Sequence, residues 1–152
     1  MPTAAQYINR ITFADRMIKL STEGLTQADT MKQFPFPANC MNWNLGHILV
    51  FRDRCLGAID GTTEADPAEY AIYGAGSEPL TDPSKALPLD VLLERLDASS
   101  QQIKDTLLSL PVEKFSEPYK THTLDDQLII YIMTHEALHV GQLEILREFV
   151  LM

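Results

Sequence analysis

The sequence predicts an all-α protein, a four-helix bundle that forms a single domain over residues 1–152. Four segments place apolar residues three and four positions apart, which is typical of helices that face a core. No segment shows the alternation of apolar and polar residues that indicates a half-buried strand. The link between the second and third segments is long, as a crossover between parallel neighbouring helices requires.

The first two predicted helices each carry one apolar stripe. The first covers Thr3 to Leu20, and its stripe consists of Tyr7, Ile11, Ala14 and Ile18. The second begins near Asn42 to Asn44, where asparagine side chains can cap the first backbone amides, and it runs to Asp60. Gly61 is a common type of residue for ending a helix. The second stripe consists of Ile48, Phe51, Cys55 and Ile59, with His47 on its flank.

The third predicted helix begins around Pro88, a residue type tolerated in a first helical turn, and ends before Pro111. Its core-facing positions are Leu89, Leu92, Leu93, Leu96, Ile103, Leu107 and Leu110. The fourth begins at Thr123, with Asp126 as a variant of a capping box, and continues to Val150. Its stripe consists of Leu128, Ile132, His135, His139, Gln142 and Leu146. Side chains that can bind metals or hydrogen-bond therefore occupy positions where apolar ones are expected.

Two long links join these helices. Residues 22–41 contain Phe34-Pro35-Phe36-Pro37, in which the residue before each proline is disfavoured in a helix. Residues 61–87 are rich in glycine, proline and small side chains and lack periodicity, so no regular structure is expected there. Loops of this length usually have a function or are mobile.

Composition excludes several classes of protein. The chain has 21 acidic and 12 basic residues, for a net charge of −9. Nucleic-acid binding draws most of its affinity from lysine and arginine, so no nucleic-acid partner is expected. No apolar run reaches the length of a membrane span, and no signal peptide is visible. Cys40 and Cys55 form neither a CxxC motif nor a disulfide framework, which favours a reduced, cytoplasmic protein.

The fourth predicted helix contains the sequence His135-Glu136-Ala137-Leu138-His139. Residues four apart share one helix face, so the two imidazoles can bind one metal ion. The alternative is that both are partly buried and hydrogen-bonded for packing alone, although two bulky polar rings in a core need partners. The same five residues match the HExxH signature of zinc peptidases.

The peptidase interpretation does not hold beyond these five residues. One peptidase class needs a third histidine six residues later, where this chain has Ile145. Another takes a glutamate from a separate helix well downstream, but only 13 residues follow His139. Glu144 and Glu148, the acids among them, belong to the same helix.

His47 is the better third ligand. It lies in the first turns of the second helix, and Gly46 before it would let a neighbouring segment approach closely. A capping or core role for His47 is the alternative. His122 stands between two threonines in a polar stretch and is expected in an exposed loop.

Two motifs together resemble a known family. Trp43-Asn44-Leu45-Gly46-His47-Ile48 and His135-Glu136-Ala137-Leu138-His139-Val140-Gly141-Gln142-Leu143 are similar to the DinB-like (YfiT-like) metal-dependent enzymes, over essentially the whole chain. The resemblance implies a bacterial bundle with up-down-down-up topology, often a homodimer. It also implies a divalent metal bound by His47, His135 and His139.

Three neutral imidazoles leave a metal position open for water or substrate, which is typical of catalytic sites. Such a metal can lower the pKa of water or bind a thiolate. Three imidazoles suit zinc, nickel, iron or copper, and affinity order alone does not choose among them. Zinc or nickel is expected, and the substrate is expected to be a small molecule. The resemblance implies an S-transferase that uses a low-molecular-weight thiol, or a hydrolase. The alternative is a non-catalytic metal-binding or dimerising bundle of the DNA-damage-inducible stress type.

Several residues near the histidines have two interpretations each. Glu136 lies about 100° around the helix from His135, so it either faces solvent or acts as a catalytic general base at the site's edge. Asn44 and Gln142 either hydrogen-bond a ligand imidazole or serve capping and packing. Cys55 is expected in the core. The aromatic residues Phe34, Phe36, Trp43 and Tyr73 either line a pocket mouth or close the core.

Overall fold

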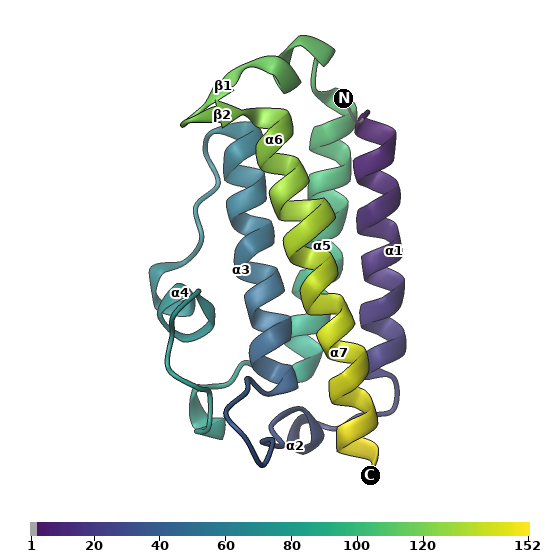
Figure 1. Cartoon of the computed structure of the whole chain (residues 1–152), viewed down its shortest axis with the longest axis vertical. Helices are drawn as coiled ribbons and strands as arrows, with labels where there is room; N and C mark the ends of the chain where they lie inside the picture. The colour runs from purple at the N-terminus through teal and green to yellow at the C-terminus, as the bar shows by residue number, and fades with distance from the viewer. Residues whose placement is uncertain (1–2) are drawn as a thin grey trace.

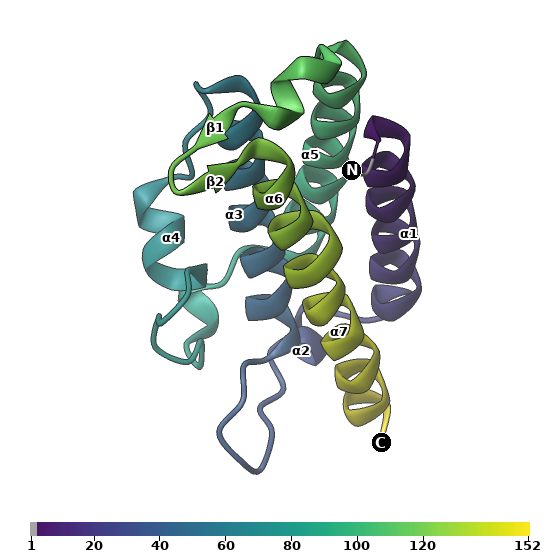
Figure 2. The same ribbon diagram turned by 45° about the horizontal axis from the view of Figure 1, so that its top comes forward.

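The computed structural model describes residues 3–152, which are mostly helical. Four long helical segments lie side by side (Figures 1 and 2): α1 (Ala4–Thr22), α3 (Met41–Asp60), α5 (Leu89–Ser109), and a last segment built from α6 (Leu124–Leu128), η3 (Ile129–His135) and α7 (Glu136–Leu151). The all-α prediction is confirmed. Within residues 3–152, every helix is too short or too polar to span a membrane.

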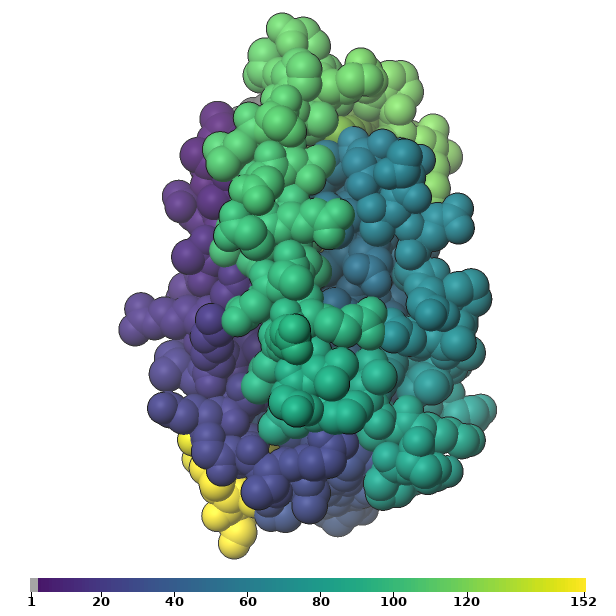
Figure 3. Space-filling view, turned by 180° about the vertical axis from the view of Figure 1, so that it is seen from behind, coloured from purple at the N-terminus to yellow at the C-terminus, as the bar shows by residue number. Residues whose placement is uncertain are grey.

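Two of the four long segments run in one direction and two in the other (Figure 1). In Figure 1, α1 and the last segment descend, whereas α3 and α5 both ascend. α3 packs against α5 and α7, and α1 packs against the same two helices. The chain between α3 and α5 returns along the outside of α3 (Figure 1). The surface seen from behind includes α1, α5 and this crossover segment (Figure 3).

Helix ends follow the local sequence signals in most cases. Thr123 caps α6 and exchanges hydrogen bonds with Asp126, as the capping box predicts. Gly61 ends α3 in the left-handed conformation, with φ of 73°. The predicted asparagine cap of α3 is wrong, because α3 begins at Met41 and Cys40 is its N-cap. The amide groups of Asn42 and Asn44 instead donate to the carbonyl oxygens of Leu87 and Cys40, respectively.

Short elements occupy the links. The expectation that residues 61–87 lack regular structure is wrong, because they contain α4 (Pro67–Tyr73) and a 3-10 turn, η1 (Pro83–Lys85). Asp66 caps α4, and Pro67 occupies its first turn. The other short elements are α2 (Gln27–Thr30), η2 (Val112–Ser116) and a two-stranded hairpin, β1 (Pro118–Tyr119) with β2 (His122–Thr123).

The last helical segment is not a uniform α-helix. Between Ile129 and His135 its hydrogen bonding is that of a π-helix, and α7 begins at the next residue. A π-helical turn holds more residues than an α-helical turn, and such turns are frequent at functional sites. The π-helical turn therefore changes the side of the helix on which His135 lies relative to the residues before it.

One buried charge connects all four long segments. Arg52 of α3 is 1% exposed. Its guanidinium donates to Asp15 Oδ1 of α1 at 2.8 Å, to the Leu96 carbonyl of α5 at 2.7 Å, and to Glu136 Oε1 of α7 at 2.5 Å. Asp15 also accepts hydrogen bonds from two side chains of α5, Ser100 and Lys104.

The electrostatics of this network favour the charged forms of Arg52 and Asp15. Burial alone would lower the pKa of Arg52, but the neighbouring carboxylates of Glu136 and Asp15 raise it above its ordinary value. Burial alone would raise the pKa of Asp15, but Arg52, Lys104 and Ser100 together lower it. The carboxylates of Asp15 and Glu136 therefore depend on the positive charge of Arg52 to balance their negative charge.

Replacing Arg52 should be strongly destabilising, because it leaves two carboxylates without their shared buried cation. For Arg52→Met we expect the free energy of unfolding in urea to fall by about 3–5 kcal/mol. Arg16→Met, at an exposed position of α1, is the control and should change it by less than about 0.5 kcal/mol. A loss of less than about 1 kcal/mol in Arg52→Met would contradict the central role of this network.

Candidate metal centre

Three histidines from two helical segments meet in the middle of the protein. His47 lies in the second turn of α3, His135 ends η3, and His139 lies in the first turn of α7. One ring nitrogen from each lies within 4.8 Å of the other two. The ring centroids are 4.5 Å apart for His47 and His139 and 4.6 Å apart for His135 and His139. The structure thus brings together the three histidines that the sequence selects.

The orientation of His47 is set by the crossover segment. Its Nδ1 lies 2.5 Å from the carbonyl oxygen of Tyr73, at the end of α4. Because a carbonyl oxygen only accepts, Nδ1 carries the proton and Nε2 keeps a free lone pair. Gly46 permits this approach, since a Cβ at that position would overlap the Tyr73 ring. The close approach predicted at Gly46 is therefore confirmed.

The orientation of His139 is set by Asn44. The Asn44 amide nitrogen donates to the Cys40 carbonyl, which turns Oδ1 toward His139 Nδ1 at 3.1 Å. His139 Nδ1 is then the protonated nitrogen, and its Nε2 keeps a free lone pair. The structure thus places Asn44 against a histidine of the cluster, in agreement with one of its two interpretations. Gln142 lines the same pocket as His139.

His135 completes the group. Its Nε2 lies 3.1 Å from His47 Nε2, and Phe51 stacks on its ring with centroids 3.9 Å apart. Within residues 3–152, its buried Nδ1 has no hydrogen-bond partner. Two nitrogens bonded to one ion at about 2.0–2.1 Å lie roughly 3 Å apart. The spacing of these two nitrogens therefore fits shared metal binding.

The three imidazoles are neutral at neutral pH. Burial lowers the pKa of His47 despite its bond to Tyr73. Burial, reinforced by the neighbouring histidines and Arg54, lowers the pKa of His135 to about 4. Burial and His47 lower the pKa of His139 to about 4. Metal binding requires the unprotonated nitrogen, so the cluster fits a divalent transition metal both in donor type and in protonation.

Glu136 lies outside this cluster. The solvent-facing interpretation is wrong, because Glu136 is 5% exposed and both of its carboxylate oxygens accept hydrogen bonds from Arg52. Its helix position about 100° from His135 turns it toward Arg52 of α3 instead. Arg52 and Asp15 were not predicted as part of the site, although Arg52 is a charged residue one turn after Ile48, on the apolar face of α3.

Two further predictions concern residues away from the metal cluster. Cys55 is buried in the core beside Tyr7 and Leu128, as predicted. His122 belongs to β2 rather than to a loop and is partly buried, and its Nε2 lies 2.7 Å from Gln127 Oε1. It is not part of the three-histidine group.

A cavity of about 440 Å³ opens beside the histidines. Asn44, His139 and Gln142 line its inner wall, and Trp43, Phe34 and Phe36 provide aromatic surface. Three of the four aromatic residues considered for a pocket mouth thus lie there. The fourth, Tyr73, is buried, and its hydroxyl donates to Asn42 and accepts from the Leu87 amide.

A methyl group on Gly46 should disturb both α4 and His47. For Gly46→Ala we expect a free energy of unfolding lower by about 1–3 kcal/mol, because the Tyr73 ring must move. Gly141→Ala is the control, since a Cβ there meets nothing within 4 Å. In a helix this change should be neutral or stabilising by up to about 1 kcal/mol. Equal effects of the two substitutions in urea unfolding would contradict the close packing at Gly46.

Comparison with known proteins agrees with the resemblance noted in the two histidine motifs. Residues 12–143 match the model of the family described as the DinB superfamily. None of the curated proteins matches the sequence. The match covers well over half of the 152 residues and includes all three histidines. The chain belongs to the DinB superfamily.

Proposed function

We propose that this protein is a metal-dependent enzyme that binds a divalent transition metal, zinc or nickel, through His47, His135 and His139. The observation that carries this proposal is the arrangement of the imidazoles: three neutral rings with neighbouring ring nitrogens, two of which have Nδ1 engaged by fixed acceptors. Three protein ligands leave room for a further ligand, as catalytic sites require. The aromatic cavity beside His139 supports a small-molecule substrate.

A metal bound there would supply Lewis acidity that activates a thiol or a water molecule as nucleophile. We propose the transfer of a low-molecular-weight thiol to a small electrophile, with hydrolysis as the related alternative. Tyr73 and Asn44 keep two imidazoles in the ligand tautomer. We assign Glu136 to positioning rather than to proton transfer, because its carboxylate is engaged by Arg52 next to the helix turn that carries His135.

We further propose the up-down-down-up topology of a four-helix bundle and a homodimeric assembly. The shared direction of α3 and α5 and the crossover along α3 support this topology (Figure 1). Large apolar residues on the outer face of α7 support the assembly, since Leu138 is 60% and Ile145 is 67% exposed. Sedimentation equilibrium should give twice the mass of the chain. The chain mass alone, at concentrations well above micromolar, would exclude the dimer.

Removing one imidazole should abolish metal binding. We expect about one metal per chain in untagged wild-type protein and almost none in His139→Ala, measured by elemental analysis after reconstitution with zinc or nickel. Added metal should raise the melting temperature of the wild type but not of the variant, because the metal binds only the folded site.

His122→Ala is the matched control, because it removes an imidazole that hydrogen-bonds Gln127 outside the cluster. It should keep its metal. Equal metal content in His139→Ala and His122→Ala would contradict the site. The absence of metal from every sample would favour a non-catalytic helical bundle with packed histidines.

A further inference from the structure

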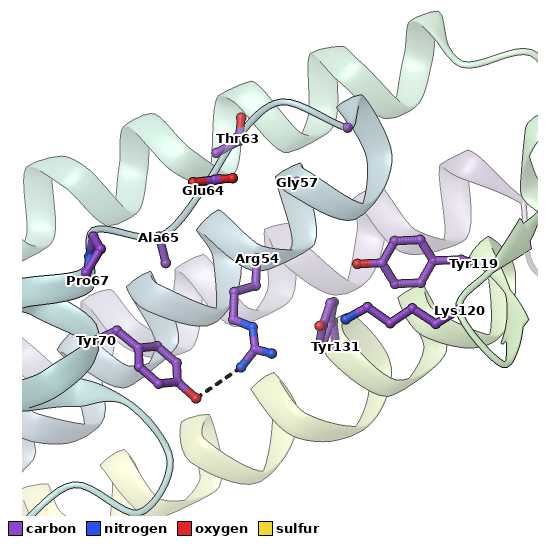
Figure 4. A pocket seen from close by; sticks show the side chains of 11 residues that line it. Arg54, Gly57, Thr63, Glu64, Ala65, Pro67, Tyr70, Tyr119, Lys120 and Tyr131 are labelled. Atoms are coloured by element: carbon purple, nitrogen blue, oxygen red, sulfur yellow. Dashed lines mark hydrogen bonds between the residues drawn. The ribbon is translucent and has the colours of Figure 1, made fainter.

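A second cavity, of about 540 Å³, lies between α3, the crossover segment and the β1–β2 hairpin (Figure 4). It shares none of its lining residues with the cavity beside His139. Its walls combine two cations with three tyrosines. These residues are Arg54, Lys120, Tyr70, Tyr119 and Tyr131.

In the part of the chain that the structure describes, the two cations of this cavity, Arg54 and Lys120, form no ion pair although the chain is acidic overall. The net charge of the chain is −9. Arg54 is half-buried and Lys120 is exposed, whereas the buried or half-buried cations Arg52, Arg95 and Lys104 are each paired with a carboxylate. Within residues 3–152, neither Arg54 nor Lys120 forms an ion pair. Glu64 is the one acidic residue among those lining the cavity. The lining therefore has a net charge of +1.

Arg54 is held in place by aromatic rings. Its guanidinium carbon lies 5.2 Å from the ring centroid of Phe51 and 5.5 Å from that of Tyr70. Its Nη1 donates to the Tyr70 hydroxyl at 3.3 Å (Figure 4). Arginine stacked in this way keeps further N–H donors free, and its planar fork matches the geometry of a carboxylate.

Lys120 is an exposed residue that lines the edge of the cavity from a strained turn. Within residues 3–152 it is the one non-glycine residue with positive φ, at 57°. The turn connects Tyr119 to its partner His122 in the hairpin, a position at which glycine would be free of strain. The Lys120 ammonium lies 5.3 Å from the centroid of the Tyr119 ring. In Figure 4 its side chain extends toward Arg54 and Tyr131.

We propose that this cavity binds a small organic carboxylate, with the carboxylate between Arg54 and Lys120 and the apolar body against the tyrosine rings. A net charge of +1 matches a monoanion better than a phosphate dianion. The ammonium explains why a lysine stands at a position that glycine would occupy without strain. The proposal does not depend on metal binding, because the three histidines do not line the cavity.

Benzoate is a suitable probe, and benzamide is its neutral counterpart of similar shape. Titration of the wild type, followed by two-dimensional NMR, should show saturable shifts at the cavity with benzoate and none with benzamide. Inorganic phosphate should bind more weakly than benzoate. Arg54→Gln and Lys120→Gly should each weaken benzoate binding roughly tenfold or more. Lys85→Gln, at an exposed position of η1, should bind as the wild type.

Two further measurements distinguish a direct loss of benzoate binding from a loss of folding and from an effect of the metal site. Lys120→Gly relieves the strained turn, so its melting temperature should stay the same or rise while benzoate affinity falls. His139→Ala should retain the wild-type benzoate affinity. The proposal would be overturned by unsaturable benzoate shifts, by equal binding of benzamide, by phosphate binding without benzoate binding, or by wild-type affinity in Lys120→Gly.

Discussion

The buried guanidinium of Arg52 constrains the whole arrangement, because it hydrogen-bonds to α1, α5 and α7 from its place on α3. A charge removed from water needs partners with good geometry, and here these come from three separate segments. Because the guanidinium of Arg52 must form hydrogen bonds to all three segments, it determines how the helices are rotated as well as which helices are adjacent. Apolar stripes alone tolerate small rotations and shifts, since their contacts are not directional.

The same constraint positions the histidines. Glu136, which accepts from Arg52, directly follows His135, so the ion pair anchors the start of α7. Close by, the three imidazoles are kept neutral by burial, and Tyr73 and Asn44 engage the Nδ1 atoms of His47 and His139. The protein thus separates a charged network that orients helices from a neutral cluster that is suited to metal binding.

Features determined by nearby residues could be predicted from the sequence. The four apolar stripes, the cap at Thr123 and the stop at Gly61 depend on residues within one or two turns. The three histidines could also be selected, because a spacing of four and a second motif are visible in the sequence. The partners of Arg52, the burial of Glu136 and the helix at Pro67–Tyr73 depend on packing between distant segments. The π-helical turn before His135 has no clear local signal.

The central claim is that three imidazoles bind one metal and leave room for a further ligand. X-ray absorption at the metal edge of the reconstituted protein tests this claim most directly. We expect scattering from three imidazole nitrogens at about 2.0–2.1 Å, together with a light non-histidine ligand. Cys40, Cys55 and the methionines are the residues of this chain that contain sulfur. Fewer than three imidazoles, or a sulfur ligand from this chain, would contradict the three-histidine site.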